Sequence, residues 1–123
     1  VHGDVLALCH LGFDINEVHR QAAHDRERFA EYWRERRLLR RRISAILRDS
    51  VESGAFREVD YSLTAVMLMS NDEAVQNWFR VSREVTRDAN AAATAVADMA
   101  VGGLLIAPNR LAGVRRNALR SFR

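Results

Sequence analysis

The sequence predicts an all-helical protein, a bundle of about five helices around one core. The 123 residues contain a single proline. No stretch shows the period-two alternation of a half-buried strand, whereas apolar residues recur at the three- and four-residue spacing of a helix. Apolar residues make up 48% of the chain, which at this length is enough to form one core without a disulfide or a metal ion.

Two short helices are expected first. Asp4 is placed to cap an apolar helix over residues 5–11. Asp14 and, three residues on, Glu17 form a capping box, which predicts a second helix over 14–23.

Three longer helices follow. A long helix is predicted over about 25–53, and it ends at Gly54, a residue that readily takes the left-handed conformation after a helix. The next helix is predicted over about 60–80. The last core helix is predicted to begin at about residue 82 or 86 and to end at about 101, and Pro108 prevents its continuation.

The segment 33–43, WRERRLLRRRI, contains six arginines. Most of them point to solvent in a helical projection, but Arg36 and Arg40 fall between Trp33 and Ile43 on the apolar side. Because an unpaired charge in apolar surroundings is costly, these two arginines need an anion or a route to water.

Three alternatives are open for these two arginines. Asp72 or Glu73 of the next helix would form an internal ion pair. The side chains would otherwise extend to water from an exposed turn. Finally, a bound ligand would supply a carboxylate or a phosphate, which the planar guanidinium matches with two hydrogen bonds. Arginines spread around a helix in this way do not form the single basic face of a DNA-reading surface.

The helix over 60–80 has two apolar faces. One contains Leu63, Met67, Asn71, Ala74 and Trp78, and the other contains Tyr61, Ala65, Leu68, Asp72, Val75 and Phe79. A helix with two such faces is either central in its domain or shared between the core and a partner surface. The polar residues Asn71 and Asp72 are either satisfied core groups or groups that orient a ligand in an apolar pocket.

The last core helix presents mostly small residues. Its apolar stripe consists of Val85, Ala89, Ala92, Val96, Met99 and Gly103. Small side chains let two helix backbones approach closely, so the stripe favours a four-helix dimer interface, with packing inside a single chain as the alternative.

Composition restricts the chemistry. The four histidines form no i, i+4 pair and Cys9 is the only cysteine, so neither a metal site nor an intramolecular disulfide is expected. There is no glycine-rich phosphate loop and no nucleophile motif. We therefore expect no enzyme and no cofactor. No apolar run approaches the ~20 residues of a membrane span, and a cytoplasmic protein is expected.

The arginines are unevenly distributed along the chain. Residues 109–123 hold five arginines and no acid, whereas residues 1–108 hold 14 arginines and 16 acids. We therefore divide the chain into a helical domain, 1–108, and a basic C-terminal tail, 109–123. The tail is expected to be either a weak amphipathic helix or a disordered terminus.

The segment 50–80, SVESGAFREVDYSLTAVMLMSNDEAVQNWFR, and the GGL of residues 102–104 resemble the C-terminal domain of TetR-family transcriptional regulators. The resemblance covers about residues 29–105 and is nearest to actinobacterial repressors of lipid or sterol catabolism, whose effectors are often acyl-CoA thioesters. It implies an all-helical ligand-sensing domain that forms a homodimer through a four-helix interface. The family's N-terminal helix-turn-helix domain, which binds operator DNA, has no counterpart in these residues, so we expect the chain to be part of a longer protein.

The resemblance implies two sets of site residues. A pocket for a largely apolar, anionic effector, such as an acyl-CoA or another lipid-like molecule, would be lined by Phe29, Trp33, Arg36, Arg40, Ile43, Met67, Asn71 and Trp78. The dimer interface would be formed by Leu68, Val75, Phe79, Ala89, Ala92, Val96, Met99 and Gly103. Effector binding would change the spacing of two DNA-reading heads. The sequence leaves the effector, the operator and the direction of regulation open.

Three other functions remain open on the sequence. A compact helical enzyme of the dimeric chorismate-mutase kind would use Arg36 and Arg40 to hold a dicarboxylate. A dimerisation or partner-docking module would bind no ligand. A nucleic-acid binder would act through the basic tail, and its affinity for random DNA would fall steeply with rising salt.

Overall fold

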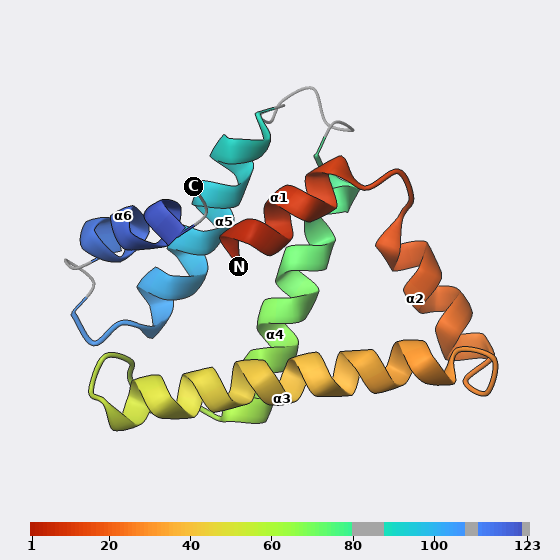
Figure 1. Ribbon diagram of the computed structural model, residues 1–123, viewed down its shortest axis with the longest axis horizontal. Coiled ribbons are helices and arrows are strands. Elements are labelled where there is room, and N and C mark those ends of the chain that lie inside the picture. Colours follow the sequence, from red (N-terminus) through yellow and green to blue (C-terminus); the bar gives the residue numbers. More distant parts are fainter. Residues whose placement is uncertain (80–87, 108–110, 122–123) are drawn as a thin grey trace.

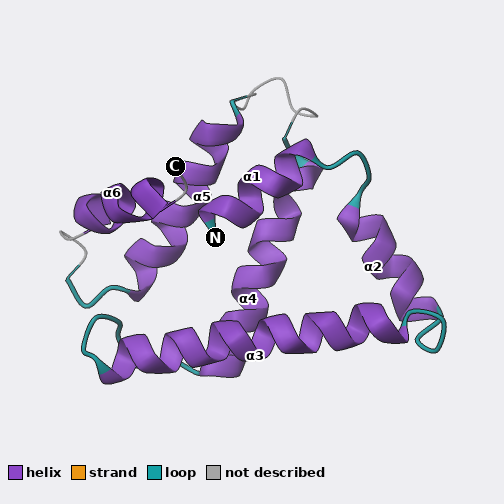
Figure 2. Cartoon of the chain, in the orientation of Figure 1, coloured by secondary structure: helices purple, strands orange, loops and turns teal. Residues whose placement is uncertain are grey.

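The computed structural model describes residues 1–79, 88–107 and 111–121 of the chain. Within these ranges the chain forms six α-helices and one short 3-10 helix, η1 (Figures 1 and 2). The elements are α1 (His2–His10), α2 (Ile15–His24), α3 (Ala30–Glu52), α4 (Tyr61–Glu73), η1 (Ala74–Asn77), α5 (Ala89–Leu104) and α6 (Leu111–Ser121). The described residues form no strand beyond one isolated antiparallel bridge between Phe56 and Leu105, which confirms the all-helical class. No helix in these ranges combines the length and the apolar composition of a membrane span.

α1 and α2 correspond to the two predicted short helices. In α1, Asp4 lies inside the first turn and does not cap the helix. α2 is capped as predicted by Asp14, whose Oδ1 accepts a hydrogen bond of 2.9 Å from the Asn16 amide. Glu17 does not complete the capping box, because its carboxylate binds Arg20 one turn further on.

α3 is the long helix, and it begins later than predicted. A turn precedes it, in which the Asp25 side chain accepts a hydrogen bond of 3.1 Å from the Arg28 amide and delays regular helical bonding. The C-terminal end of α3 is as predicted. Gly54 follows it with a φ of +82°, the left-handed conformation that glycine adopts without strain.

α4 begins after Asp60, whose carboxylate accepts a hydrogen bond of 2.9 Å from the Leu63 amide. The predicted continuous helix over 60–80 is wrong in its second part. After Glu73 the chain tightens into the 3-10 turn η1, which is a common way for an α-helix to end.

η1 carries a polar junction between the first two helices. The Gln76 side chain donates hydrogen bonds to the carbonyls of Leu8 and Phe13 at 3.0 and 3.1 Å. Its carbonyl oxygen accepts one of 2.8 Å from the Ile15 amide. One amide side chain therefore joins the end of α1, the following loop and the start of α2 to the end of α4.

α5 begins after Asp88, which accepts a hydrogen bond of 2.9 Å from the Asn90 amide. The predicted start of this helix, at 82 or 86, lies outside the described residues. Its end is three residues later than the predicted 101, at Leu104.

The basic tail contains a helix, α6, which packs across α5 (Figure 1). Nε and Nη2 of Arg115 donate to the two carboxylate oxygens of Asp98 at 2.9 and 2.5 Å. Leu111, Val114 and Leu119 of α6 face α5 across a small hollow of about 50 Å³. α6 thereby covers one side of α5.

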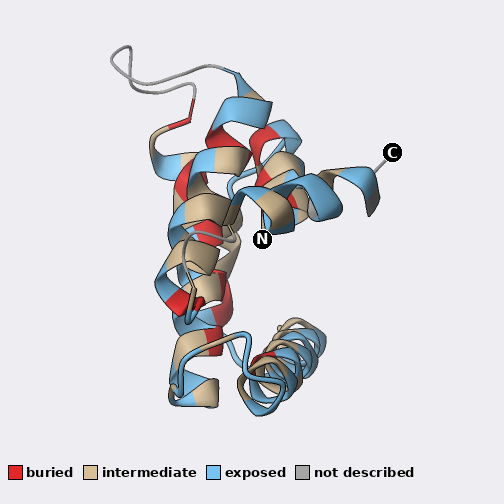
Figure 3. Cartoon of the chain, turned by 90° about the vertical axis from the view of Figure 1, so that its left-hand side faces the viewer, coloured by how far each residue is buried: buried red, intermediate tan, exposed pale blue. Residues whose placement is uncertain are grey.

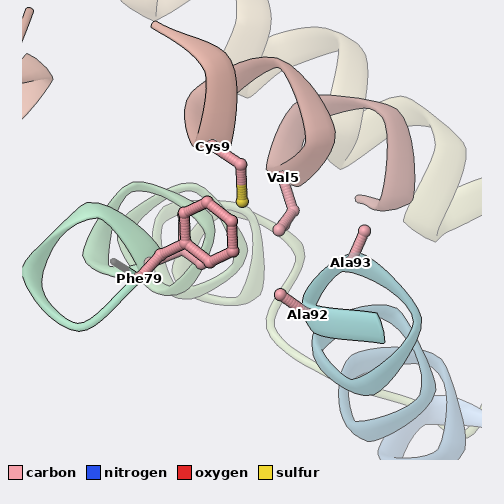
Figure 4. Packing of buried hydrophobic residues seen from close by; sticks show 6 residues of the cluster. Val5, Cys9, Phe79, Ala92 and Ala93 are labelled. Atoms are coloured by element: carbon pink, nitrogen blue, oxygen red, sulfur yellow. The ribbon is translucent and has the colours of Figure 1, made fainter. Parts of the chain in front are cut away.

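Two apolar clusters hold the helices together. The first joins α1, α5 and the end of α4, and its buried residues are Val5, Cys9, Val75, Phe79, Ala92 and Ala93 (Figure 4). The second joins α3, α4 and α5 through Leu47, Ala65 and Leu104. α4 runs from one cluster to the other (Figure 1). Figure 3 shows that α3 is mostly half-buried or exposed, and Leu47 is its one buried residue.

Candidate ligand-binding groove and association surface

Arg36 of α3 forms an ion pair with Glu73, the last residue of α4. Nη1 of Arg36 binds Oε1 of Glu73, and Nη2 lies 3.4 Å from Oε2. Both side chains are 19% exposed. Burial opposes the charge on Arg36, but the Glu73 carboxylate outweighs this effect and the pKa of Arg36 is raised. Of the three alternatives for Arg36, the internal ion pair is therefore the one observed.

Polar and aromatic contacts continue from this ion pair to α2. Arg36 Nη1 lies 3.5 Å from the Tyr32 hydroxyl, which in turn lies 3.0 Å from Nδ1 of His19. Trp33 meets His19 edge-on, with 5.2 Å between the ring centroids. Its Nε1 donates a hydrogen bond of 3.0 Å to the carbonyl of Ala22. Side chains of α3 therefore hold α2 in place.

These residues border a hollow of about 210 Å³ between α2, α3 and α4, which we call the α3 groove. It is lined by His19, Trp33, Arg36, Arg37, Arg40, Val66 and Met69. Arg34, Arg36 and Arg48 of α3 each meet a carboxylate within 4.0 Å. In the described part of the chain, Arg37 and Arg40 have no such partner. The groove thus combines apolar and aromatic walls with two uncompensated cations, a chemistry suited to an anion attached to an apolar body.

A larger hollow of about 790 Å³, which we call the α4–α5 groove, runs between α4 and α5. It is lined by Arg57, Val59, Asp60, Leu63, Thr64, Val66, Met67, Leu68, Ser70, Asn71, Met99, Ala100, Gly103 and Leu104. Leu63, Met67 and Met99 are 58%, 60% and 70% exposed. Exposed apolar side chains gathered in this way are typical of an association surface.

The structure divides the predicted pocket residues between these two grooves. Trp33, Arg36 and Arg40 meet in the α3 groove. Met67 and Asn71 lie in the α4–α5 groove, on the other side of α4. The predicted set therefore does not form one site.

The three remaining pocket residues line neither groove. Phe29 packs edge-on against Tyr32 before the start of α3, with 6.5 Å between ring centroids. Ile43 packs on the second apolar cluster, and Trp78 packs on the first. These three side chains therefore pack against other side chains of the domain and do not border either groove.

Sequence reasoning misses four residues of the α3 groove, namely His19, Arg37, Val66 and Met69. A helical projection of α3 places Arg37 in solvent. In the structure Arg37 is indeed exposed, and it also lines the groove. Nothing in the sequence indicates that α2 packs against the first turn of α3. The aromatic pair Tyr32 and Trp33, followed by arginines at helical spacing, is the one signal that could have pointed to the place.

The two apolar faces predicted for residues 60–80 lie in other surroundings than expected. The face expected at a dimer interface is buried inside one chain, because Val75 and Phe79 belong, with Ala92, to the first apolar cluster. The face expected in a pocket is open to solvent at Met67 and Asn71. A side chain that is already buried in its own chain has no area left to offer a partner.

The other predicted interface residues fall into two groups. Leu68, Met99 and Gly103 line the α4–α5 groove. Ala89 and Val96 pack on the first apolar cluster. The open part of the predicted interface is therefore its end near Met99.

Asp72 lines neither groove. It is 5% exposed, and its Oδ1 has no hydrogen-bond partner among the described residues. Burial raises the pKa of Asp72 to about 7, and the carboxylates of Asp4 and Glu73 add to this increase. Asp72 is therefore a core carboxyl group that titrates near neutral pH.

The chain is thus a small all-helical domain with two hollows, the α3 groove and the α4–α5 groove. Residues 17–104 match the protein family described as tetracyclin repressor-like, C-terminal domain. The chain belongs to this family, which confirms the resemblance to TetR-family regulators. No curated protein and no solved structure matches the chain significantly.

The family gives the domain a general role. Its members are effector-binding and dimerisation domains of transcriptional regulators rather than enzymes. They are generally dimeric, and DNA binding resides in an N-terminal domain. The matched range extends from α2 to the end of α5 and includes every residue that lines the two grooves.

Proposed function

We propose that the chain binds a largely apolar, anionic small molecule in the α3 groove and pairs with a second copy through the α4–α5 groove. One observation supports the ligand site above all. Trp33 and Met69 adjoin Arg40, a cation that meets no carboxylate in the described part of the chain. A half-buried guanidinium beside apolar side chains is a suitable partner for an anion from outside the chain.

Arg40, with Arg37 beside it, is the anion-binding group in this proposal. Arg36 is already compensated by Glu73, so an incoming anion gains less from it. A planar guanidinium offers parallel N–H groups to the oxygens of a carboxylate or a phosphate. The Arg26 guanidinium lies over the Trp33 ring, 4.6 Å from its centroid. The part of the ring that lines the groove and the adjoining side chains of α4 would pack on the apolar part of the ligand.

The size of the α3 groove favours a ligand that enters with one part only. Its volume of about 210 Å³ is smaller than the ~300–1,000 Å³ of sites that enclose a drug-sized molecule. We infer that the groove takes the anionic end and part of the carbon chain of a lipid-like molecule, such as a fatty acid or an acyl-CoA. This ligand class agrees with a regulator of lipid or sterol catabolism of the actinobacterial type.

The α4–α5 groove fits a second copy of the chain. α4 contributes exposed large side chains such as Met67. α5 contributes an exposed stripe at every fourth position, formed by Ala91, Ala95, Met99 and Gly103. A two-fold pairing of these surfaces would bring four helices together and remove their apolar area from water.

Calorimetric titration with laurate, lauroyl-CoA and dodecanol tests the ligand site. Laurate or lauroyl-CoA should bind at least tenfold more tightly than dodecanol, which has the same chain length and no charge. Arg40→Ala should weaken binding of the anion at least tenfold. Arg42→Ala, which removes an exposed arginine outside the groove, should leave it within twofold.

Two results would contradict the ligand site. Equal affinities for laurate and dodecanol would show that no cation takes part. A stable dimer that takes up none of the three compounds would instead identify a dimerisation module without a ligand.

A further inference from the structure

Within the described residues, Glu73 is the one carboxylate that contacts an arginine of the α3 groove. It reaches Arg36 from the end of α4 and does not itself line the groove. The net charge at the groove is therefore lower than its three arginines suggest, because Glu73 neutralises Arg36 without lining the groove.

A ligand anion at Arg40 would lie close to this ion pair. Arg36 and Arg40 are four residues apart on α3 and so lie on the same side of the helix. Both line the same hollow. An anion bound there is attracted by Arg36 and repelled by Glu73, and the low exposure of the pair limits the screening of both effects by water.

We propose that Glu73 is an internal competitor of the effector, which means that its carboxylate occupies Arg36 when no ligand is bound and lowers the affinity of the groove for anions. This inference rests on the proposed ligand site. Glu73 then determines specificity as well as affinity. Neutral apolar molecules do not compete with it, whereas carboxylates and phosphates do.

The position of Glu73 gives this competition a structural consequence. Its backbone carbonyl accepts a hydrogen bond of 3.1 Å from Nδ2 of Asn16 in α2. Three residues further on, Gln76 holds the end of α1 and the start of α2. A ligand that weakens the bond between Arg36 and Glu73 therefore acts on the place where α2, α3 and α4 are tied together.

Glu73→Gln tests the proposal, because it keeps the size of the side chain and removes its charge. We expect the affinity for laurate to rise at least fivefold and the affinity for dodecanol to stay within twofold. A purely structural role predicts the opposite, since loss of the ion pair would loosen the groove and weaken both ligands. Glu35→Gln is the matched control; it removes an exposed carboxylate of α3 that does not line the groove and should change laurate binding less than twofold.

A second measurement uses the unmodified chain and holds even if the variant does not fold. We expect laurate to shift the 13C resonance of the Glu73 carboxylate towards that of an exposed glutamate, and dodecanol to leave it unchanged. An unchanged or lower laurate affinity in Glu73→Gln, or a resonance that does not respond to saturating laurate, overturns the inference. If Arg40→Ala still abolishes laurate binding, the ligand site itself stands, whereas failure of the unmodified chain to bind laurate removes both.

Discussion

The two sides of α4 differ in how the rest of the chain covers them. On the inner side, Met69 and Asp72 are 7% and 5% exposed. On the outer side, Met67 is 60% exposed and Asn71 is exposed as well. The inner side packs on α3 through Ala65 and borders the α3 groove at Met69, and the outer side is a wall of the α4–α5 groove. The comparison shows that similar residues on one helix are buried on one side and form an exposed apolar surface on the other.

Truncation of one methionine on each side should give the largest difference. Met69→Ala should lower the free energy of unfolding by about 2–3 kcal/mol, because the side chain is almost fully buried although it borders the α3 groove. Met67→Ala should change that free energy by less than about 0.5 kcal/mol in the monomer. Urea unfolding at a protein concentration too low for dimerisation measures both values. Equal losses would show that the outer side is packed within the chain, and the comparison would fail.

Asp72 should make the stability of the chain depend on pH near neutrality, whereas exposed carboxylates should not. Its pKa is raised by burial from 3.8 to about 7. Between these values the folded chain keeps a proton that the unfolded chain has released, so stability falls as pH rises through this window and is constant above it. The free energy of unfolding should therefore be about 2–3 kcal/mol lower at pH 8 than at pH 5.

Chemical unfolding across this pH range tests the assignment to Asp72. Asp72→Asn should remove most of the decrease. Asp49→Asn, which changes an exposed carboxylate of α3, should leave the decrease in place. A flat profile in the unmodified chain would mean that the Asp72 carboxyl is solvated.

A charge on the outer side should weaken self-association. Met67→Glu would place a carboxylate in the apolar α4–α5 groove, and we expect the dimer dissociation constant to rise at least tenfold, or about 1.4 kcal/mol. Ser62→Glu, on the same helix but outside the groove, is the control and should leave dimerisation unchanged. Sedimentation equilibrium gives both constants. A dimer that tolerates Met67→Glu would place the interface elsewhere.

The ion pair at the inner end of α4 should give the smallest effect. Arg36→Ala leaves the half-buried Glu73 without its partner and should cost about 1 kcal/mol, less than the ~3–5 kcal/mol of a fully buried pair. Arg34→Ala breaks only an exposed contact with Glu31 and should stay within about 0.5 kcal/mol. Thermal unfolding of the two variants makes the comparison. Equal values would show that the pair of Arg36 and Glu73 is as solvated as a surface pair.

Local signals in the sequence were sufficient for the fold class and for several helix ends. Asp14, Asp60 and Gly54 act at helix ends as their chemistry predicts. Glu73, the partner of Arg36, was among the predicted alternatives, because a charged side chain on the apolar side of a helix can be satisfied in only a few ways. These features depend on residues within one or two turns or on the sign of a charge.

The sequence could not show which helix covers which face. Helical phase places Met67 and Val75 on different sides of one helix, but it does not say which side meets α1 and which meets solvent. The end of the α4 helix at Glu73 depends on Gln76, whose partners lie more than 60 residues earlier in the chain. For the same reason the α3 groove, which needs α2 opposite α3, was only half predicted.

The packing of α6 on α5 has a consequence for the proposed dimer. α1 covers one side of α5 through Ala92 and Ala93, and α6 covers another through Asp98. α5 is left with a single open stripe, which ends at Gly103. In the proposed dimer, two copies that face each other would bury this stripe on both chains and leave no equivalent stripe for a third. Association through α5 would then be closed at two, because α6 covers a side of α5 that a further copy would need.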